Sequence, residues 1–464
     1  MRPWAGLINN DFMQDEQIRQ LNDRPARNGS YVLYWMQQSQ RANANLALEY
    51  AIERANEAAC PVLVGFVLDE RYPEANARHF AFMLQGLVDV AEELAERAIG
   101  FVVARGTPPD PIMDLAAEAS VVVCDRGYVR HVRAWRSELA RQCEVEVVEV
   151  EDNAVVPVDL VSTKREYAAR TIRPKIHRHL DRFLGAKSSG QVIRRWVGTP
   201  GVSSHTGFDS EAMLARIAVD RAAAPVSAFV GGRREALRRL DQFVRLRLNG
   251  YAEKRSDPSL DATSTLSPYL HFGHLAPVEI VRAVQDADTC GQDDRDTLVE
   301  ELVVRRELAI NYAEREPDYD EYGALPEWAR KTLDEHRSDP RPYVYDIDQL
   351  ESAQTHDPYW NAAMTEMTRT GFMHNYMRMY WGKKILEWMS DPEEAFYTAL
   401  YLNNKYFLDG RDPNSYAGVG WVFGLHDRPW TRRPIFGTIR YMNANGLKRK
   451  FDIERYVRRV EGGV

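Results

Sequence analysis

The side chains with the clearest chemical potential lie in one stretch near the C-terminal end, GFMHNYMRMYWGKKILEW (371–388). On a helix, spacings of 4, 3, 4 and 3 residues bring five of them to one face: His374, Arg378, Trp381, Ile385 and Trp388. Trp381 and Trp388 would then lie about 10 Å apart along the axis, at about 1.5 Å per residue. Indoles at this spacing are more often part of a core than of a ligand site, so the tryptophans alone leave both roles open.

Arg378 favours the ligand site, because a guanidinium on an apolar face is costly unless it has an acidic partner. Asp409 and Asp412, in the turn-rich segment 402–421, could supply that partner. The same segment contains glycines, which permit close approach of the backbone to a ligand; they are Gly410, Gly418 and Gly420.

A second group of polar residues lies in the segment 249–275, where hydroxyl side chains precede Pro268 and an apolar run. Free hydroxyls and exposed amides at the start of a helix suit a phosphate group. An ordinary N-cap would use the same residue types, so both interpretations stay open. The hydroxyl residues are Ser264, Thr265 and Ser267.

The segment 428–459 is strongly basic within an acidic protein. It holds ten Lys or Arg against Asp452 and Glu454, a local charge of +8, whereas the whole chain carries −8. Such an asymmetry indicates a surface for a polyanion such as nucleic acid, although a solvated helix end would look the same.

The first third of the chain predicts the scaffold. Five apolar runs are typical of buried strands: 31–36, 61–68, 100–105, 120–125 and 144–150. Helical patterns separate them, which predicts an α/β fold with a doubly wound, parallel, five-stranded sheet and helices on both faces. Ligands of such sheets bind at the carboxyl edge of the strands. No GxGxxG opens a helix, so the common dinucleotide fingerprint is missing.

The rest of the chain is mostly helical. Gly-, Ser- and Pro-rich stretches between the two parts predict a long connector. We therefore expect an N-terminal extension (1–29), an α/β domain (30–155), a connector (156–232) and a larger all-α domain (233–464).

Composition excludes several classes of protein. Hydrophobic residues make up 44% and charged residues 28% of the 464 residues, which is typical of a globular protein. No apolar run reaches the roughly 18 residues of a membrane span, and the N-terminus has no apolar signal core, so we expect a cytoplasmic protein. The four cysteines form no CxxC pair, so we expect no metal or disulfide site.

Several long motifs together carry a family resemblance: LSPYLHFG, RRELAINY, THDPYWNA, MRMYWGKKILEW, YLNNKYFLDGRDPNSYAGVGW and IRYMNANGLKRKFD. They resemble the class II cyclobutane pyrimidine dimer DNA photolyases, over residues 30–456. The resemblance implies light-driven repair of UV-damaged DNA by a bound, reduced FAD that gives one electron to a flipped-out thymine dimer. It implies FAD held among the C-terminal helices of a protein that acts as a monomer on duplex or single-stranded DNA.

The resemblance also implies roles for individual residues. Those expected to bind FAD are Tyr251, Ser264, Thr265, Leu266, Ser267, Arg378, Lys383, Asn403, Asp409 and Gly410. In this assignment Arg378 pairs with Asp409 over the flavin ring, and Asn403 faces flavin N5. Trp381, Trp360 and Trp388 resemble the class II chain that carries electrons to the flavin, with Tyr345 and Tyr380 as side members.

The expected DNA contacts are Arg255, Glu301, Arg305, Met379, Trp421, Arg428 and Arg440. Trp421 and Met379 would form the stacking surface and floor of the dimer pocket. Glu301 would hydrogen-bond a thymine carbonyl, which we expect to require a protonated carboxyl in a closed apolar pocket. Arg428 and Arg440 would hold the DNA backbone.

Some residues depart from the family pattern. Arg305 stands where some members have a second tryptophan, Asn375 where glycine is common, and Thr265 where many have asparagine. The carboxyl edge of the sheet could also hold a second, light-harvesting chromophore of the 8-hydroxydeazaflavin type or another pigment, and no motif decides this.

Two other functions compete with repair. A cryptochrome-type blue-light receptor would keep FAD and the tryptophans without repairing DNA; Glu301, Trp421 and the basic segment argue against it. A flavin-free nucleotide-binding protein would use the aromatic residues only as core.

Overall fold

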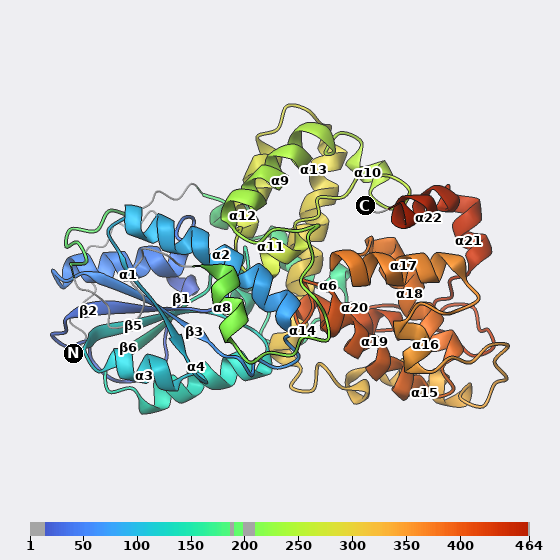
Figure 1. Cartoon of the computed structure of the whole chain (residues 1–464), viewed down its shortest axis with the longest axis horizontal. Helices are drawn as coiled ribbons and strands as arrows, with labels where there is room; N and C mark the ends of the chain where they lie inside the picture. The colour runs from blue at the N-terminus through green and yellow to red at the C-terminus, as the bar shows by residue number, and fades with distance from the viewer. Residues whose placement is uncertain (1–13, 186–189, 198–208, 463–464) are drawn as a thin grey trace.

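The computed structural model describes residues 14–185, 190–197 and 209–462. Residues 1–13 of the expected N-terminal extension, residues 186–189 and 198–208 of the expected connector, and residues 463–464 lie outside this part. Figure 1 shows a sheet flanked by helices at one end of the molecule and a larger, helical part at the other.

The sheet of the described chain has six strands in the order β1-β6-β5-β2-β3-β4. The strands are β1 (Ile18–Gln20), β2 (Tyr31–Met36), β3 (Val62–Leu68), β4 (Gly100–Arg105), β5 (Ala119–Asp125) and β6 (Glu146–Val150). The five predicted parallel strands are confirmed. The predicted number is wrong by one, because β1 adds an antiparallel edge strand beside β6. Its three residues are largely exposed and contain no apolar run, so periodicity could not reveal it.

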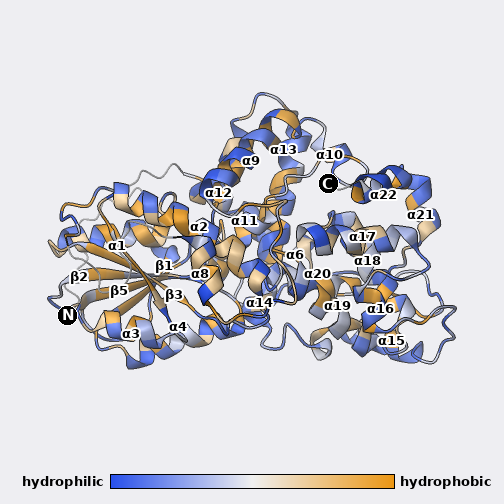
Figure 2. Ribbon diagram, viewed as in Figure 1, coloured by the Kyte–Doolittle hydropathy of each residue, from blue (hydrophilic) through white to orange (hydrophobic). Residues whose placement is uncertain are grey.

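Each central strand is buried on both faces, which explains the continuous apolar runs. Along β2, Val32, Tyr34 and Met36 pack toward one core, while Leu33 and Trp35 pack toward the other. The covering helices are α1 (Leu46–Glu57), α2 (Ala77–Glu96), α3 (Asp110–Ala116) and α4 (Arg130–Gln142). Figure 2 shows the hydrophobic residues running along the strands, whereas the helices carry both kinds of residue.

Shorter helices connect the sheet to the helical part. They are α5 (Val158–Val161), α6 (Ala169–His177), α7 (Leu180–Phe183), α8 (Ser210–Arg216), α9 (Arg233–Leu246), α10 (Tyr251–Lys254), α11 (Ser267–His271), α12 (Pro277–Gln285) and α13 (Gln292–Val299). A π-helical segment, η2 (Glu300–Arg305), joins α13 to α14 (Arg306–Arg315). Isolated π turns are frequent at functional sites. Short 3-10 turns are found at η1 (Asp15–Gln17) and η3 (Tyr322–Ala324).

The remaining helices form the C-terminal bundle. They are α15 (Glu327–Glu335), α16 (Ile347–Glu351), α17 (Pro358–Thr370), α18 (Asn375–Trp388), α19 (Pro392–Tyr406), α20 (Pro413–Val422), α21 (Ala444–Lys450) and α22 (Ile453–Glu461). Helix α18 packs between α17 and α19, and most of its residues are buried. Hydrogen bonds from Arg78 of α2 to the carbonyls of Met367 (3.2 Å) and Tyr406 (2.8 Å) tie the sheet to this bundle.

Within the described residues, no helix combines the length and the apolar character that crossing a membrane requires. The same residues include no group of His, Cys, Asp and Glu arranged to hold a metal ion.

Candidate functional site

Two adjoining cavities open among the C-terminal helices, with volumes of about 530 Å³ and about 240 Å³. Four residues line both of them: Glu301, Arg378, Asn414 and Ser415. Helices α18 and α20 and the π-helical segment η2 supply these residues. The chain therefore forms one elongated hollow with a wide part and a narrow part.

Most of the residues expected to bind ligand or DNA line this hollow. The larger cavity is lined by Arg255, Glu301, Arg305, Arg378, Met379, Trp381, Lys383, Asn403, Trp421 and Arg440. The smaller cavity is lined by Tyr251, Ser264, Leu266, Ser267, Glu301, Arg378 and Asp409. Trp360 and Trp388 lie behind the wall as buried side chains, while Thr265, Gly410 and Arg428 line neither cavity.

Arg378 and Asp409 form an ion pair where the two cavities meet. The Nη2 atom of Arg378 lies 3.0 Å from both carboxylate oxygens of Asp409, and its Nε donates to the carbonyl of Met373 at 3.1 Å. The guanidinium also lies 3.8 Å above the ring centre of Phe407. Asp412, the other acid that could have served, pairs instead with His271 at 3.2 Å.

Asn403 and Lys383 are buried polar residues in the wall of the larger cavity. The side-chain amide of Asn403 donates to Oδ1 of Asn404 at 3.0 Å. Lys383 donates to the carbonyl of Val422, and burial lowers the pKa of its ammonium group to about 7. Its charge therefore changes close to neutral pH.

The tryptophans lead from the cavity toward the surface. Trp381 lines the cavity, and Trp360 donates its Nε1 to the backbone carbonyl of Trp381 at 2.9 Å. The rings of Trp360 and Trp388 lie 5.4 Å apart in an edge-to-face arrangement. Tyr345, 5.3 Å from Trp388, extends the series. Tyr380 instead bonds through its hydroxyl to Asp357, the N-cap residue of α17.

Glu301 forms an ion pair with Arg255 at 3.0 Å, and about 31% of its side chain is exposed. The environment of this carboxyl is therefore polar and partly open, and its protonation in a closed apolar pocket stays a prediction. Arg305, at the position where some photolyases have tryptophan, stacks 5.3 Å above the ring of Trp421 and bonds to Glu300 at 3.1 Å. It thereby forms part of the same wall.

Three expected ligand contacts are not supported by the geometry. Thr265 adopts a left-handed backbone conformation (φ 55°) and faces Arg239 at 3.4 Å rather than the cavity. Gly410 packs against α19, because an added Cβ would lie 3.0 Å from the Cα of Asn404. Arg428 is exposed and stacks on Trp430, outside the hollow.

Two exposed cations of the basic segment, Arg440 and Lys450, lie at the larger cavity. Arg440 lines the mouth and stacks, like Arg428, on Trp430. Lys450 lies 3.2 Å from the hydroxyl of Tyr376, which is another lining residue. In the described chain, seven exposed cations of the basic segment form no ion pair with a carboxylate: Arg428, Arg433, Arg440, Lys448, Arg449, Lys450 and Arg455. This distribution favours a polyanion over a solvated helix end.

Asn414 and Ser415 are lining residues that sequence reasoning missed. Asp412 caps α20 by accepting the amide of Asn414 at 2.9 Å, and Pro413 follows at the first turn. The DPNS sequence was therefore a readable signal for a helix that begins at the site. The π-helical turn that carries Glu301 has no comparable sequence signal.

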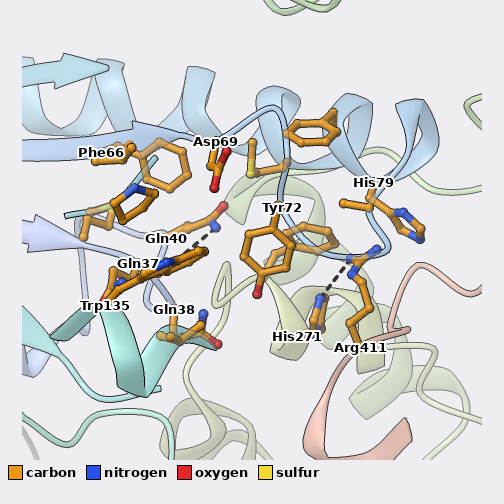
Figure 3. A pocket seen from close by; sticks show the side chains of 18 of the residues that line it. Gln37, Gln38, Gln40, Phe66, Asp69, Tyr72, His79, Trp135, His271 and Arg411 are labelled. Atoms are coloured by element: carbon orange, nitrogen blue, oxygen red, sulfur yellow. Dashed lines mark hydrogen bonds between the residues drawn. The ribbon is translucent and has the colours of Figure 1, made fainter. Parts of the chain in front are cut away.

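A third cavity, of about 80 Å³, lies at the carboxyl edge of the sheet, as Figure 3 shows. Residues after β2 and β3, including Gln37, Gln40, Asp69 and Tyr72, line one side of it. Arg411 reaches in from the helical part, and its Nη2 lies 3.4 Å from His271.

This combination of a Rossmann-like sheet, a helical bundle and a deep aromatic hollow defines the photolyase and cryptochrome architecture. The fold is similar to that of a class III photolyase from Agrobacterium tumefaciens, with a TM-score of 0.72 and 20% identity over 94% of this chain and 87% of that one. The DNA photolyase family model matches residues 32–192.

Two curated relatives identify the family more narrowly. A deoxyribodipyrimidine photo-lyase from Methanothermobacter thermautotrophicus is 46% identical, covering 96% of this chain and 98% of that protein. One from Oryza sativa is 40% identical, covering 96% and 90% respectively. The chain belongs to the DNA photolyase family, a family of DNA repair enzymes.

Proposed function

We propose that this protein is a class II photolyase that repairs cyclobutane pyrimidine dimers in UV-damaged DNA by light-driven electron transfer from FAD. The long motifs quoted above support the class, and the family membership supports photolyase-type repair. The observation that carries the proposal is the two-part hollow. The Arg378–Asp409 ion pair lies where its two cavities meet, and Trp360 and Trp388 lie behind its wall.

The residues of the hollow fit FAD. Hydroxyls of Ser264 and Ser267 line the narrow part and suit phosphate or ribityl oxygens. Where the two cavities meet, Arg378 offers a cation and Asp409 a hydrogen-bond acceptor to a polar ring system. The buried Nε1 of Trp381 has no hydrogen-bond partner among the described residues, so it is a donor that a ligand acceptor could satisfy. When bound and reduced, FAD would supply the light-driven transfer of one electron to the pyrimidine dimer.

The wide part suits an extruded pyrimidine dimer. Trp421 offers a stacking face and Met379 an apolar floor, as reading a flipped base requires. Arg255 can donate to a pyrimidine carbonyl once its ion pair with Glu301 rearranges around the lesion, and Glu301 can donate to one when its carboxyl is protonated. The cations at the mouth would bind phosphates without reading sequence.

Trp381, Trp360 and Trp388 would carry electrons from the protein surface to the flavin site. The rings of Trp360 and Trp388 are in edge-to-face contact, and Trp360 is hydrogen-bonded to the backbone carbonyl of Trp381, so the three residues are neighbours. Tyr345, 5.3 Å from Trp388, would extend this electron-transfer series toward the surface.

The third cavity suits a second, light-harvesting chromophore. Its aromatic walls and polar edge match a flat, partly polar pigment such as a deazaflavin, although its volume would require side chains to move. Absorption spectroscopy of the purified protein would reveal such a pigment beside FAD.

Illumination of the reduced protein with DNA that contains cyclobutane dimers tests the proposal. We expect intact thymines to return, and no repair of (6-4) photoproducts under the same light. FAD binding without repair would favour the cryptochrome-type receptor, and purified protein that binds no FAD would overturn the proposal.

A further inference from the structure

We propose that Asn404 and Glu74 are positioning residues that fix the side-chain amide of Asn403 so that its oxygen, not its nitrogen, faces the larger cavity. The inference rests on the proposed function, because the group it would act on is the flavin. It concerns residues outside the cavity wall, since neither Asn404 nor Glu74 lines it.

The two ends of an asparagine amide look alike in a structure, so their orientation must follow from partners of fixed polarity. Asn404 has two such partners. The backbone N–H of Arg411, which can only donate, lies 2.9 Å from one end of the Asn404 amide. The carboxylate of Glu74, which accepts when ionised, lies 2.9 Å from the other end. The first end must therefore be Oδ1 and the second Nδ2.

The orientation of Asn403 follows from that of Asn404. Its inner amide end lies 3.0 Å from Oδ1 of Asn404, which is an acceptor, so this end must be the NH₂ group. The oxygen of Asn403 is then left for the cavity, and it forms no hydrogen bond with any described residue. A ligand group opposite this oxygen is favoured when it carries a proton that it can donate.

Packing constrains the hydrogen-bonded series formed by Asn403, Asn404 and Glu74. Asn404 is fully buried. The tight turn at Gly410 brings the Arg411 amide against α19, because a Cβ at Gly410 would lie 2.9 Å from the carbonyl of Phe407. On the other side, Asn76 donates to the carbonyl of Lys405 at 2.8 Å and holds the loop that carries Glu74 against the end of α19.

This arrangement favours the reduced flavin over the oxidised one. Reduced flavin carries a hydrogen on N5, whereas oxidised flavin offers only a lone pair there. The resemblance places Asn403 opposite N5, so an oxygen held toward the cavity binds the reduced form more tightly. If Asn404 were removed, the Asn403 amide could turn its NH₂ to the cavity and bind the oxidised form instead.

The test is the midpoint potential of bound FAD, which reports the ratio of affinities for reduced and oxidised flavin. Asn404→Ala should lower that ratio about tenfold, the effect of one hydrogen bond, or about 30 mV for a two-electron couple. Asn404→Asp combined with Glu74→Gln should restore it. The carboxylate introduced at position 404 still accepts from both N–H groups, and the amide introduced at position 74 supplies the donor that this carboxylate then faces.

Asn311→Ala is the matched control. Asn311 is also fully buried and bonds through both amide ends, to the amide of Glu166 at 2.7 Å and the carbonyl of Lys164 at 3.1 Å, away from the cavity. It should lose stability without a change in potential. An Asn404→Ala protein with a lowered melting temperature and a potential within about 10 mV of the original would overturn the inference.

Glu74→Lys covers the case in which Asn404→Ala fails to fold, because Glu74 is exposed. A lysine there places a donor against Nδ2 of Asn404, so the potential should move in the same direction; an unchanged potential would overturn the inference. Protein that binds no FAD at all would instead overturn the proposed function.

Discussion

The ion pair between Arg378 and Asp409 gives the sharpest stability prediction. The exposed fractions are only 21% for the Arg378 side chain and 11% for that of Asp409, and the described chain forms no other ion pair or hydrogen bond with this carboxylate. Arg378→Met therefore leaves a nearly buried carboxylate without a partner. Breaking a buried pair from one side costs about 3–5 kcal/mol. Because this pair keeps some contact with the cavity, we expect about 3 kcal/mol.

Thermal unfolding of the flavin-free protein would measure this loss without the contribution of ligand binding. For a folded unit of 150–250 residues, about 3 kcal/mol lowers the melting temperature by about 6–12 °C. The loss should persist at high salt, since a partly buried pair is weakly screened. Asp409→Asn should cost less, because its amide still accepts and the cation of Arg378 remains partly solvated.

The double variant Arg378→Met with Asp409→Leu separates the pair from its surroundings. With both charges gone, no unpaired carboxylate is left, so the double variant should be more stable than Arg378→Met alone. Two results would refute the reasoning. One is a double variant whose loss of stability equals the sum of the losses of the two single variants, and the other is an Arg378→Met protein that melts within about 1 °C of the original.

Three further predictions concern electron transfer, the lesion and pH. Trp381→Phe should slow photoreduction of bound FAD at least about tenfold while chemically reduced enzyme still repairs, which flash photolysis and repair assays would separate; unchanged photoreduction would place the first donor elsewhere. Glu301→Gln should keep FAD and DNA affinity but lower the repair yield per absorbed photon, and an equal yield would remove Glu301 from the reaction. The pKa of Lys383 is about 7 in the folded protein, below its ordinary 10.5, so the folded state binds fewer protons between these pH values. The free energy of unfolding should therefore rise from pH 7 to 10.5 by a few kcal/mol, and Lys383→Met should flatten that rise in denaturant titrations.

Much of the fold could be predicted from the sequence because the buried strands read as uninterrupted apolar runs. The edge strand β1 could not, since Ile18–Gln20 is stabilised by its hydrogen bonds to β6 and not by burial. Likewise, the choice of Asp409 over Asp412 as partner of Arg378 depends on how the turn at Gly410 folds, which no local pattern encodes.

The residues of the site could be predicted from the sequence only where a family motif contains them. Ser264, Ser267 and Trp421 line the hollow, whereas Thr265 and Gly410, their neighbours in the same motifs, do not. A motif records which residues occur together; the left-handed turn at Thr265 decides that its hydroxyl points away from the cavity.

The burial of helix α18 explains its unusual composition. Nine of its fourteen residues are buried, so it has few solvent-facing positions on which to place polar residues. Each cation on it must then be held by a specific partner: Arg378 by Asp409, Lys383 by the carbonyl of Val422 and Lys384 by Glu387. A purely structural helix in this position would be more stable with leucines, because buried charges seldom add stability. Core packing alone therefore does not explain the three partnered basic side chains that this helix carries among its tryptophans.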